Sequence, residues 1–240
     1  MKFDIFEKGL EEYHVVLSDF QKRQFVLFYD LLTEKNKVMN LTAITEWEDV
    51  VVKHFLDSLS VIKVLGKDCF SGKTLLDLGT GAGFPGIPLA IVFPELQVIL
   101  LDSLLKRVRF LQEVKDALDL SNVKPLHGRA EDLARNVSLR EQMDLVVSRA
   151  VAPLCVLSEY CLPFAKVGGT FIAYKSVSKD EEQEEACHAI QMLGGELVRT
   201  EDFLLPGTDI PRSLILIQKK KASSDSYPRK AGIPKKKPLS

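Results

Sequence analysis

Residues 74–86 read TLLDLGTGAGFPG, an apolar run that ends at Asp77 and is followed by three glycines at alternate positions. These glycines are Gly79, Gly81 and Gly83. Glycine permits a positive φ and lets a ligand approach the backbone without meeting a Cβ atom. Pro85 suits the first turn of a helix, where its missing N–H costs little. The segment therefore predicts a strand, a glycine turn and a helix, which together form a nucleotide-type site at the carboxyl end of a sheet.

The spacing of the glycines separates the possible cofactors. A dinucleotide fingerprint that began at Gly79 would need glycine where the chain has Phe84. No phosphate-cradling G-x-x-x-x-G-K-[ST] sequence is present. The remaining pattern, D-x-G-x-G-x-G, resembles the first motif of class I S-adenosylmethionine-dependent methyltransferases. That resemblance implies a loop beside the methionine and ribose of the cofactor, with an acid near Asp77 that orders the loop or the amino-acid end.

Acidic residues follow the next two strands and are further candidates for the cofactor site. Asp102 lies 23 residues after Gly79, where a carboxylate can accept hydrogen bonds from both ribose hydroxyls. Asp102 could instead cap the helix that begins at Ser103, but with the glycine loop in place we favour ribose binding. Farther along, Glu131 or Asp132 could bind the exocyclic amine of adenine, or could be a charge at a helix N-terminus. The sequence does not separate these two interpretations.

Beyond the loop, short β-rich runs alternate with helical stretches from Lys73 onward. The expected strands are Thr74–Leu78, Gln97–Leu101, Val123–His127, Asp144–Ser148, Thr170–Lys175, Gly195–Phe203 and Ser213–Gln218. The expected helices cover residues 85–93, 104–119, 131–140, 154–164 and 180–193. This alternation predicts an α/β fold with a Rossmann-like methyltransferase sheet, mostly parallel and covered on both faces. Only a loop separates the last two strands, so we expect an antiparallel pair at one edge.

The organisation predicted for the whole chain has three parts. Residues 1–66 form an N-terminal helical region, in which capping-box sequences at Ser18–Gln21 and Thr45–Glu48 mark two helix starts. Residues 67–220 form the S-adenosylmethionine-binding Rossmann-like domain. Residues 221–240 form a basic C-terminal tail.

Charge is distributed unevenly, although the net charge of the chain is only −1. The segment from Lys219 to Ser240 carries eight basic residues and one acid, so its net charge is +7 and that of residues 1–218 is −8. A basic tail on an acidic body suggests contact with a polyanion. The alternative is a solvated, disordered tail that only aids solubility, and charge alone does not separate the two.

Composition excludes several classes of protein. The chain is 46% hydrophobic and 27% charged, which is ordinary for a globular protein. No apolar run approaches the ~20 residues that span a bilayer, and the N-terminus has no secretory h-region. The four cysteines include no C-x-x-C pair and no zinc-ligand spacing. We therefore expect a cytoplasmic protein with reduced cysteines, no metal site and no membrane contact.

Several motifs, in order along the chain, resemble those of one family. They are Asn40-Leu41-Thr42, HFLDSL at 54–59, DLGTGAGFPG at 77–86, Arg129-Ala130-Glu131, Ser148-Arg149-Ala150 and YPRKAGIP at 227–234. Together they resemble the bacterial small-subunit ribosomal RNA methyltransferase G family, RsmG, also called glucose-inhibited division protein B. The resemblance covers the chain nearly end to end. It implies methylation of N7 of a guanine in 16S rRNA near the decoding site.

The resemblance also implies a set of residues that bind S-adenosylmethionine. This set consists of Gly79, Phe84, Ala130, Glu131 and Arg149. The loop and strand arguments add Gly81 and Asp102. The expected partner is 16S rRNA or the small ribosomal subunit or its precursor. Nothing in the sequence specifies an oligomeric state, and a monomer is the expectation.

The chemistry of guanine N7 explains why no acid–base constellation is needed. N7 has an in-plane lone pair and no proton, so it can attack a sulfonium methyl in line without a general base. Alignment of the two reactants can supply about 7–11 kcal/mol. No residue is therefore assigned as a catalytic acid or base. Arg149 and Lys175, at the ends of the fourth and fifth expected strands, are candidates for positioning the guanine or its phosphate.

Alternatives stay open at several positions. Arg149 could instead form a surface ion pair. Lys106, Arg107 and Arg109 follow Asp102 and form either part of an RNA face or a solvated helix face. His54 and Asp57 are three residues apart and share one helical face, which we interpret as a structural pair.

Two other functions are compatible with the sequence. One is methylation of a 2′-oxygen or of another base nitrogen in RNA, and the other is a non-catalytic ribosome assembly factor with a vestigial cofactor site. The segment Ser148–Val151 lacks the [DN]-P-P-[YF] turn of methyltransferases that act on exocyclic amines. The intact glycine loop and Asp102 argue against a vestigial site.

Overall fold

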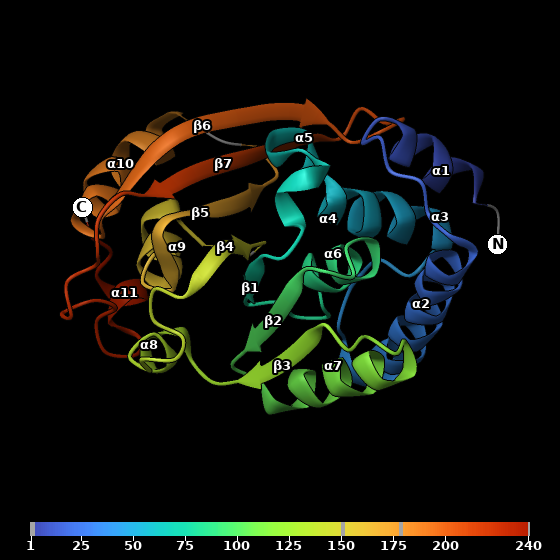
Figure 1. The fold of residues 1–240 in the computed structure, drawn as a ribbon, viewed down its shortest axis with the longest axis horizontal. Coiled ribbons are helices and arrows are strands. Elements are labelled where there is room, and N and C mark those ends of the chain that lie inside the picture. Colours follow the sequence, from blue (N-terminus) through green and yellow to red (C-terminus); the bar gives the residue numbers. More distant parts are fainter. Residues whose placement is uncertain (1–2, 150–151, 178–179, 240) are drawn as a thin grey trace.

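The computed structural model describes residues 3–149, 152–177 and 180–239, and these contain a seven-stranded sheet with the strand order β3-β2-β1-β4-β5-β7-β6 (Figure 1). The strands are β1 (Thr74–Leu78), β2 (Gln97–Asp102), β3 (Val123–His127), β4 (Met143–Ser148), β5 (Ala165–Lys175), β6 (Gly195–Leu204) and β7 (Pro211–Lys219). The first five pair in parallel, and β7 is antiparallel to both of its neighbours. The predicted Rossmann-like sheet with an antiparallel edge pair is confirmed.

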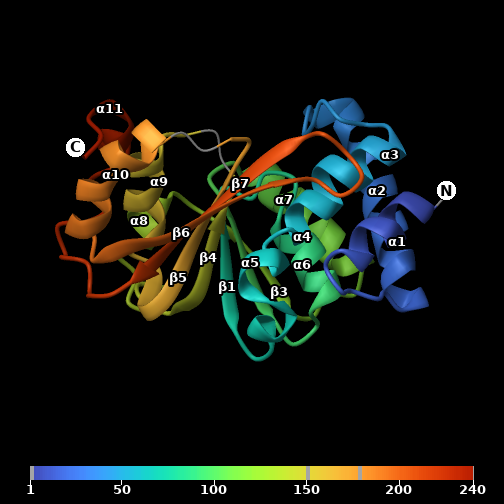
Figure 2. The ribbon, with the colours of Figure 1, turned by 90° about the horizontal axis from the view of Figure 1, so that it is seen from above.

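Helices cover both faces of the sheet (Figure 2). They are α6 (Gly86–Val92), α7 (Leu105–Ala117), α8 (Ala130–Leu133), α9 (Leu154–Cys161), α10 (Asp180–Met192) and α11 (Ile233–Lys236). Consecutive residues of a strand point to opposite faces, so Leu75 packs in the core beneath α6 while Leu76 packs in the core beneath α9. Because both faces are buried, the central strands are apolar almost throughout.

One predicted helix is much shorter than expected. The sequence predicted a helix over residues 131–140, but α8 ends at Leu133. Asn136 then accepts a hydrogen bond from the backbone N–H of Ser138, in a local turn that competes with helix. The remaining predicted helices agree with the structure to within a few residues at each end.

The N-terminal region is helical, as predicted, and lies on the α6 and α7 side of the sheet. Its elements are α1 (Asp4–Glu11), α2 (Asp19–Met39), α3 (Trp47–Val50), the π-helix η1 (Val51–Leu56), α4 (Asp57–Leu59), α5 (Ile62–Leu65) and the 3₁₀-helix η2 (Lys67–Phe70). The capping box at Ser18 is confirmed, with reciprocal hydrogen bonds to Gln21. The second capping box is wrong, because Glu46 and not Thr45 precedes α3 and makes no side-chain cap.

Aromatic side chains join the N-terminal helices to the glycine loop. Phe25 and Phe28 of α2 and Phe55 of η1 are fully buried, and Phe84 of the loop packs against Phe28 with 5.2 Å between ring centroids. The N-terminal region therefore shares one hydrophobic core with the sheet and fixes one side of the loop. No helix in the described part of the chain is long and apolar enough to cross a membrane.

Residues 221–239, the described part of the predicted basic tail (221–240), run along α8 and α9 and include α11 (Figure 2). The backbone N–H of Gly232 donates to Glu131 of α8, and Arg229 pairs with the buried Glu159 of α9. The alternative of a disordered, solvated tail therefore does not hold for these residues.

Candidate functional site

The glycine loop leaves β1 in the conformation that its sequence requires. Gly79, Gly81 and Gly83 have φ values of +73°, +62° and +102°. The backbone N–H groups of Gly79 and Thr80 donate to the carbonyl of Leu101 at 2.9 and 3.2 Å, which ties the loop to β2. No heavy atom lies within 4 Å of the Cβ position at Gly79, so a ligand can approach the backbone there.

Asp77 holds the two ends of the loop together. Its Oδ2 accepts from the Thr80 hydroxyl at 2.6 Å and from the backbone N–H of Gly86 at 2.8 Å. A Cβ at Gly86 would come within 2.9 Å of this same oxygen, so the helix start needs glycine. Asp77 is fully buried, and burial raises the pKa of its carboxyl group to about 6. Its Oδ1 has no hydrogen-bond partner among the described residues.

Asp102 ends β2 with both carboxylate oxygens engaged. Oδ2 accepts from the backbone N–H of Gly81 at 3.0 Å and lies 3.3 Å from Arg107. Oδ1 accepts from the backbone N–H of Leu104 at 2.9 Å, just before α7 begins. The carboxylate thus orders both the glycine loop and the approach to α7, and it also faces a cavity. Ribose binding by Asp102 stays a prediction.

This cavity, the cofactor cavity, has a volume of about 360 Å³ and lies at the carboxyl ends of β1, β2 and β3. Gly79, Asp102, Ala130 and Glu131 all line it, so four of the seven predicted cofactor residues come together. Tyr160 of α9 also lines it, and no signal in the sequence pointed to this residue. The other three predicted residues, Gly81, Phe84 and Arg149, are outside its lining.

Phe84 has a packing position. It is 5% exposed, and its ring stacks on that of His54 with 4.5 Å between centroids. The Arg149 guanidinium lies 5.1 Å from the Phe84 ring centroid on the same aromatic cluster. Any contact of Phe84 with a cofactor remains implied by resemblance, while its support of Arg149 is visible in the structure.

A second cavity, the arginine cavity, has a volume of about 770 Å³. Its lining includes Lys53, His54, Asp57, Arg149, Lys175 and Arg212. Arg149 follows the last residue of β4 just as Gly79 follows the last residue of β1, and these two strands are neighbours. The Ser148 hydroxyl donates to the carbonyl of Leu78 at 2.9 Å and ties the two strand ends together. The two cavities therefore flank the paired ends of β1 and β4.

Asp57 binds two guanidinium groups in the arginine cavity. Its Oδ2 lies 2.7 Å from Arg149 Nη1, and its Oδ1 lies 2.9 Å from Arg212 Nε. Asp57 is 3% exposed, so this is not the surface ion pair considered as an alternative for Arg149. Two cations share one carboxylate, which leaves the cluster positively charged and suited to an anion or an electron-rich base edge.

Arg212 was missed by the sequence analysis. It lies near the start of β7, 155 residues from the Asp57 that it contacts. Nothing local to the sequence marks it, because its position depends on β7 pairing with β5 in the register Ser213 to Lys175.

His54 is a neutral support for Arg149. Its Nδ1 lies 3.3 Å from Arg149 Nη2 and its Nε2 lies 2.9 Å from the Thr42 hydroxyl. Burial, together with the Arg149 charge, lowers the pKa of His54 to about 3. An arginine cannot accept a proton, so Nδ1 accepts from Arg149 and Nε2 carries the hydrogen. His54 and Asp57, expected to form a structural pair, thus each contact Arg149.

Acid is expected to destabilise the fold through His54. The unfolded state binds a proton near the ordinary pKa of about 6.5 whereas the folded state resists it until about 3, so stability present above pH 6.5 is lost as the pH falls. We expect wild type to lose up to about 1.4 kcal/mol per pH unit relative to His54→Gln between pH 6 and pH 4. Urea unfolding at each pH measures the difference.

The comparison with the variant is needed because Asp77 acts in the opposite direction. Its raised pKa means that the folded protein gains stability as the pH falls from about 6 to 4. That contribution is the same in wild type and variant and cancels in the difference. Parallel pH profiles for the two proteins would contradict a buried neutral His54.

Lys175 lines the arginine cavity, as predicted, but its charge is compensated. Its Nζ lies 2.6 Å from Glu182 and donates to the carbonyl of Ala152 at 2.7 Å. Lys106 and Arg109 of α7 are exposed, which keeps both interpretations of that helix face open. Ala150 of the Ser148–Ala150 motif lies outside the described residues.

Comparisons with known proteins converge on one family. The family described as rRNA small subunit methyltransferase G matches residues 21–209. A ribosomal RNA small subunit methyltransferase G from Lachnoclostridium phytofermentans is 54% identical over 98% of this chain and 96% of that protein. The protein of the same name from Alkaliphilus metalliredigens is 50% identical over 98% of both chains.

Solved structures share the fold at low sequence identity. TrmN from Thermus thermophilus has a TM-score of 0.53 at 18% identity, over 70% of this chain and 53% of that one. TYW2 from M. jannaschii, solved in complex with AdoMet, has a TM-score of 0.51 at 17% identity, over 67% of this chain and 74% of that one. These likenesses support the sheet architecture described above.

Proposed function

Because the chain belongs to the rRNA small subunit methyltransferase G family, we propose that it transfers a methyl group from S-adenosylmethionine to N7 of a guanine in 16S rRNA, near the decoding region. The observation that carries this proposal is the pair of cavities on either side of the β1 and β4 ends. One is lined by a bare glycine backbone and acids, and the other by arginines. A methyl donor and an anionic acceptor would meet between them.

The residues of the cofactor cavity fit S-adenosylmethionine. Gly79 leaves its backbone accessible, and Asp102 places a carboxylate where ribose hydroxyls can donate to it. Ala130 and Glu131 follow β3, where the adenine would lie. When bound, the cofactor supplies a methyl group already activated by its sulfonium charge. The role of the protein is then to bind, orient and exclude water.

The arginine cavity suits an RNA nucleotide. Its volume of about 770 Å³ is within the usual range for a small-molecule site, so a base turned out of its stack fits. Arg149 and Arg212 can donate to guanine O6 or to a phosphate. Three acids also line the cavity: Asp57 and Glu182 are held in ion pairs with these cations and with Lys175, and Glu185 is exposed. This fits a reaction in which N7 has no proton to lose.

Labelled S-adenosylmethionine and small-subunit RNA that lacks the modification provide the test. We expect label in the RNA, and nucleoside mass spectrometry should identify it as N7-methylguanosine. Assays on deproteinised 16S rRNA, on a precursor particle and on the mature subunit would show which form is the substrate. A different methylated nucleoside would contradict the N7 assignment, and no transfer to any of the three forms would contradict the function.

A further inference from the structure

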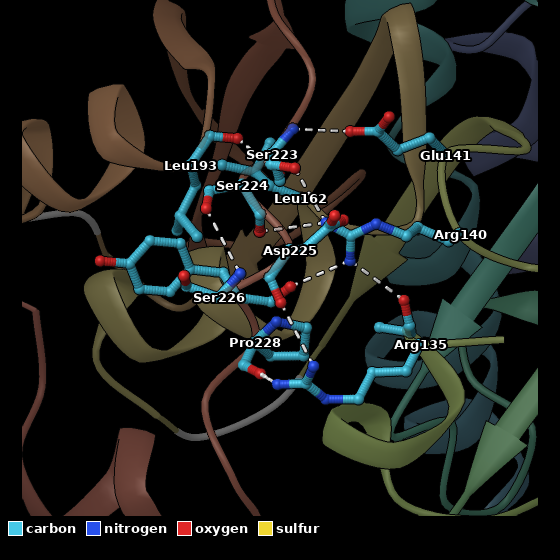
Figure 3. Close-up of polar contacts among 12 residues, drawn as sticks. Arg135, Arg140, Glu141, Leu162, Leu193, Ser223, Ser224, Asp225, Ser226 and Pro228 are labelled. Atoms are coloured by element: carbon cyan, nitrogen blue, oxygen red, sulfur yellow. Dashed lines mark hydrogen bonds and ion pairs between the residues drawn. The ribbon is translucent and has the colours of Figure 1, made fainter. Parts of the chain in front are cut away.

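The C-terminal arm, residues 220–239, is clamped to the body by two arginines (Figure 3). Arg140 donates to the carbonyls of Ser223, Ser224 and Tyr227 at 2.9, 3.1 and 2.9 Å. Arg135 donates to the carbonyl of Pro228 at 2.6 Å and to that of Asp225 at 3.2 Å. These donors contact the backbone, so they fix the path of the arm.

Two ion pairs, each with one fully buried partner, anchor the ends of the clamped stretch. Lys219, just before the arm, is fully buried, with its Nζ 3.1 Å from Glu141. Within the arm, Arg229 lies 2.6 Å from Glu159, which is 1% exposed and contacts both Nε and Nη2. Burying charges costs desolvation energy unless geometry and hydrogen bonds compensate. A segment that served only solubility would need no such fixed path.

Along the clamped path the arm runs from the amino ends of the sheet strands to their carboxyl ends. Glu141 accepts from the backbone N–H of Ser223 at 2.7 Å. It precedes β4 and so lies at the amino ends of the strands. The backbone N–H of Gly232 donates to Glu131 at 3.0 Å, and Glu131 lines the cofactor cavity at the carboxyl ends of the strands. Gly232 therefore lies beside the cofactor cavity, and Lys230 and the lysines of α11 are close to it in the chain.

The part of the arm from Lys230 to Lys237 carries positive charges without ion-pair partners among the described residues. Lys230, Lys235, Lys236 and Lys237 are all exposed, and within the described ranges no carboxylate lies within ion-pair distance of any of them. Arg129, which lines the cofactor cavity, is exposed nearby. Residues 1–218, by contrast, have a net charge of −8. The cluster of positive charge on the arm is therefore where a polyanion would be attracted.

We propose that the C-terminal arm is a rigid docking element that binds phosphates of the RNA substrate through Lys230, Lys235, Lys236 and Lys237, next to the cofactor cavity. This inference rests on the proposed function, since it assigns part of the surface that the RNA occupies. Phosphate contacts fix the orientation of a nucleic acid without reading its sequence. The clamp matters because lysines on a fixed backbone lose less freedom on binding than lysines on a mobile tail.

The four lysines can be tested without disturbing the fold, since all are exposed. Replacing all four with glutamine should raise the KM for small-subunit RNA by roughly tenfold or more at low salt. It should also make the slope of log affinity against log salt shallower by about 3. The kcat and the cofactor Kd should stay unchanged. The matched control replaces Lys8, Lys37, Lys67 and Lys124, also exposed and away from the arm, and should alter both RNA readouts much less.

The clamp is tested separately with Arg135→Gln, since Arg135 is exposed and, among the described residues, its hydrogen bonds are to the arm backbone. This variant keeps all four lysines, so we expect weaker RNA binding with the wild-type salt slope. An unchanged KM and slope in the four-lysine variant, or an equal loss in the control, would overturn the inference. Failure of the proposed function is distinct, because there wild type itself would transfer no methyl group while filter binding could still report the RNA contact.

Discussion

Replacing Asp57 with asparagine is expected to lower kcat/KM for methylation by at least about a hundredfold and to reduce the free energy of unfolding by about 3 kcal/mol. Asp57 is buried and is the counter-ion shared by Arg149 and Arg212, at 2.7 and 2.9 Å. Without the carboxylate, two guanidinium groups would repel one another across the arginine cavity. Both arginines would lose the orientation that the acceptor nucleotide needs. Urea unfolding and steady-state kinetics with both substrates measure the two effects.

A nearby acid supplies the matched control for this change. Asp49 pairs with Lys53 at 2.7 Å, but its side chain is 50% exposed and solvent screens the pair. Asp49→Asn should change stability by less than about 1 kcal/mol and leave kcat/KM near the wild-type value. If the two variants behaved alike, the buried network would have no special role in positioning the arginines.

Replacing Gly79 with valine should raise the Kd for S-adenosylmethionine by roughly a hundredfold or more. Gly79 has a φ of +73°, which a β-branched residue adopts only at a cost of about 1–2 kcal/mol. Its Cβ position is open to the cofactor cavity, so the valine side chain would occupy the space in which the ligand approaches the backbone. Calorimetric titration with S-adenosylmethionine gives the affinity.

Gly72→Val separates the cost of backbone strain from the effect of a side chain that blocks the cofactor cavity. Gly72 has a φ of +65° and no heavy atom within 4 Å of its Cβ position. It lies in the turn before β1, at the amino end of the strand and therefore away from the cofactor cavity. This control should lose stability comparable to that lost by Gly79→Val and keep its cofactor affinity. A wild-type Kd in Gly79→Val would show that the cofactor binds elsewhere.

The two cavities share support from the N-terminal helices. Phe84 leaves the glycine loop and stacks on His54, and His54 in turn contacts Arg149 of the arginine cavity. The residues Val51–Leu56 that carry His54 form a π-helix, a form that is rare and frequent at functional sites. The N-terminal region therefore acts as a frame that sets the glycine loop and the arginine at a fixed separation.

Local chemistry was enough to predict the sheet and its loop. The strands Thr74–Leu78 and Val123–His127 were predicted to the residue. For Thr74–Leu78 the limits are local, because its apolar residues end where the glycine loop begins. The positive φ angles of the loop followed from its glycines. The capping box at Ser18 held for the same reason, since its partners are three residues apart. Signals of this kind depend only on near neighbours in the chain.

Contacts between distant residues could not be predicted in this way. Arg212 joins Asp57 only because β7 inserts between β5 and β6, and this strand order leaves no trace in the sequence around either residue. The basic C-terminal segment was visible as composition, but its path is set by Arg135 and Arg140, which no motif marked. The sequence by itself determined the strand–glycine turn–helix unit, because its conformation is a property of adjacent residues. Only the tertiary structure decided which charges meet and where the arm ends, because these depend on how the sheet is assembled.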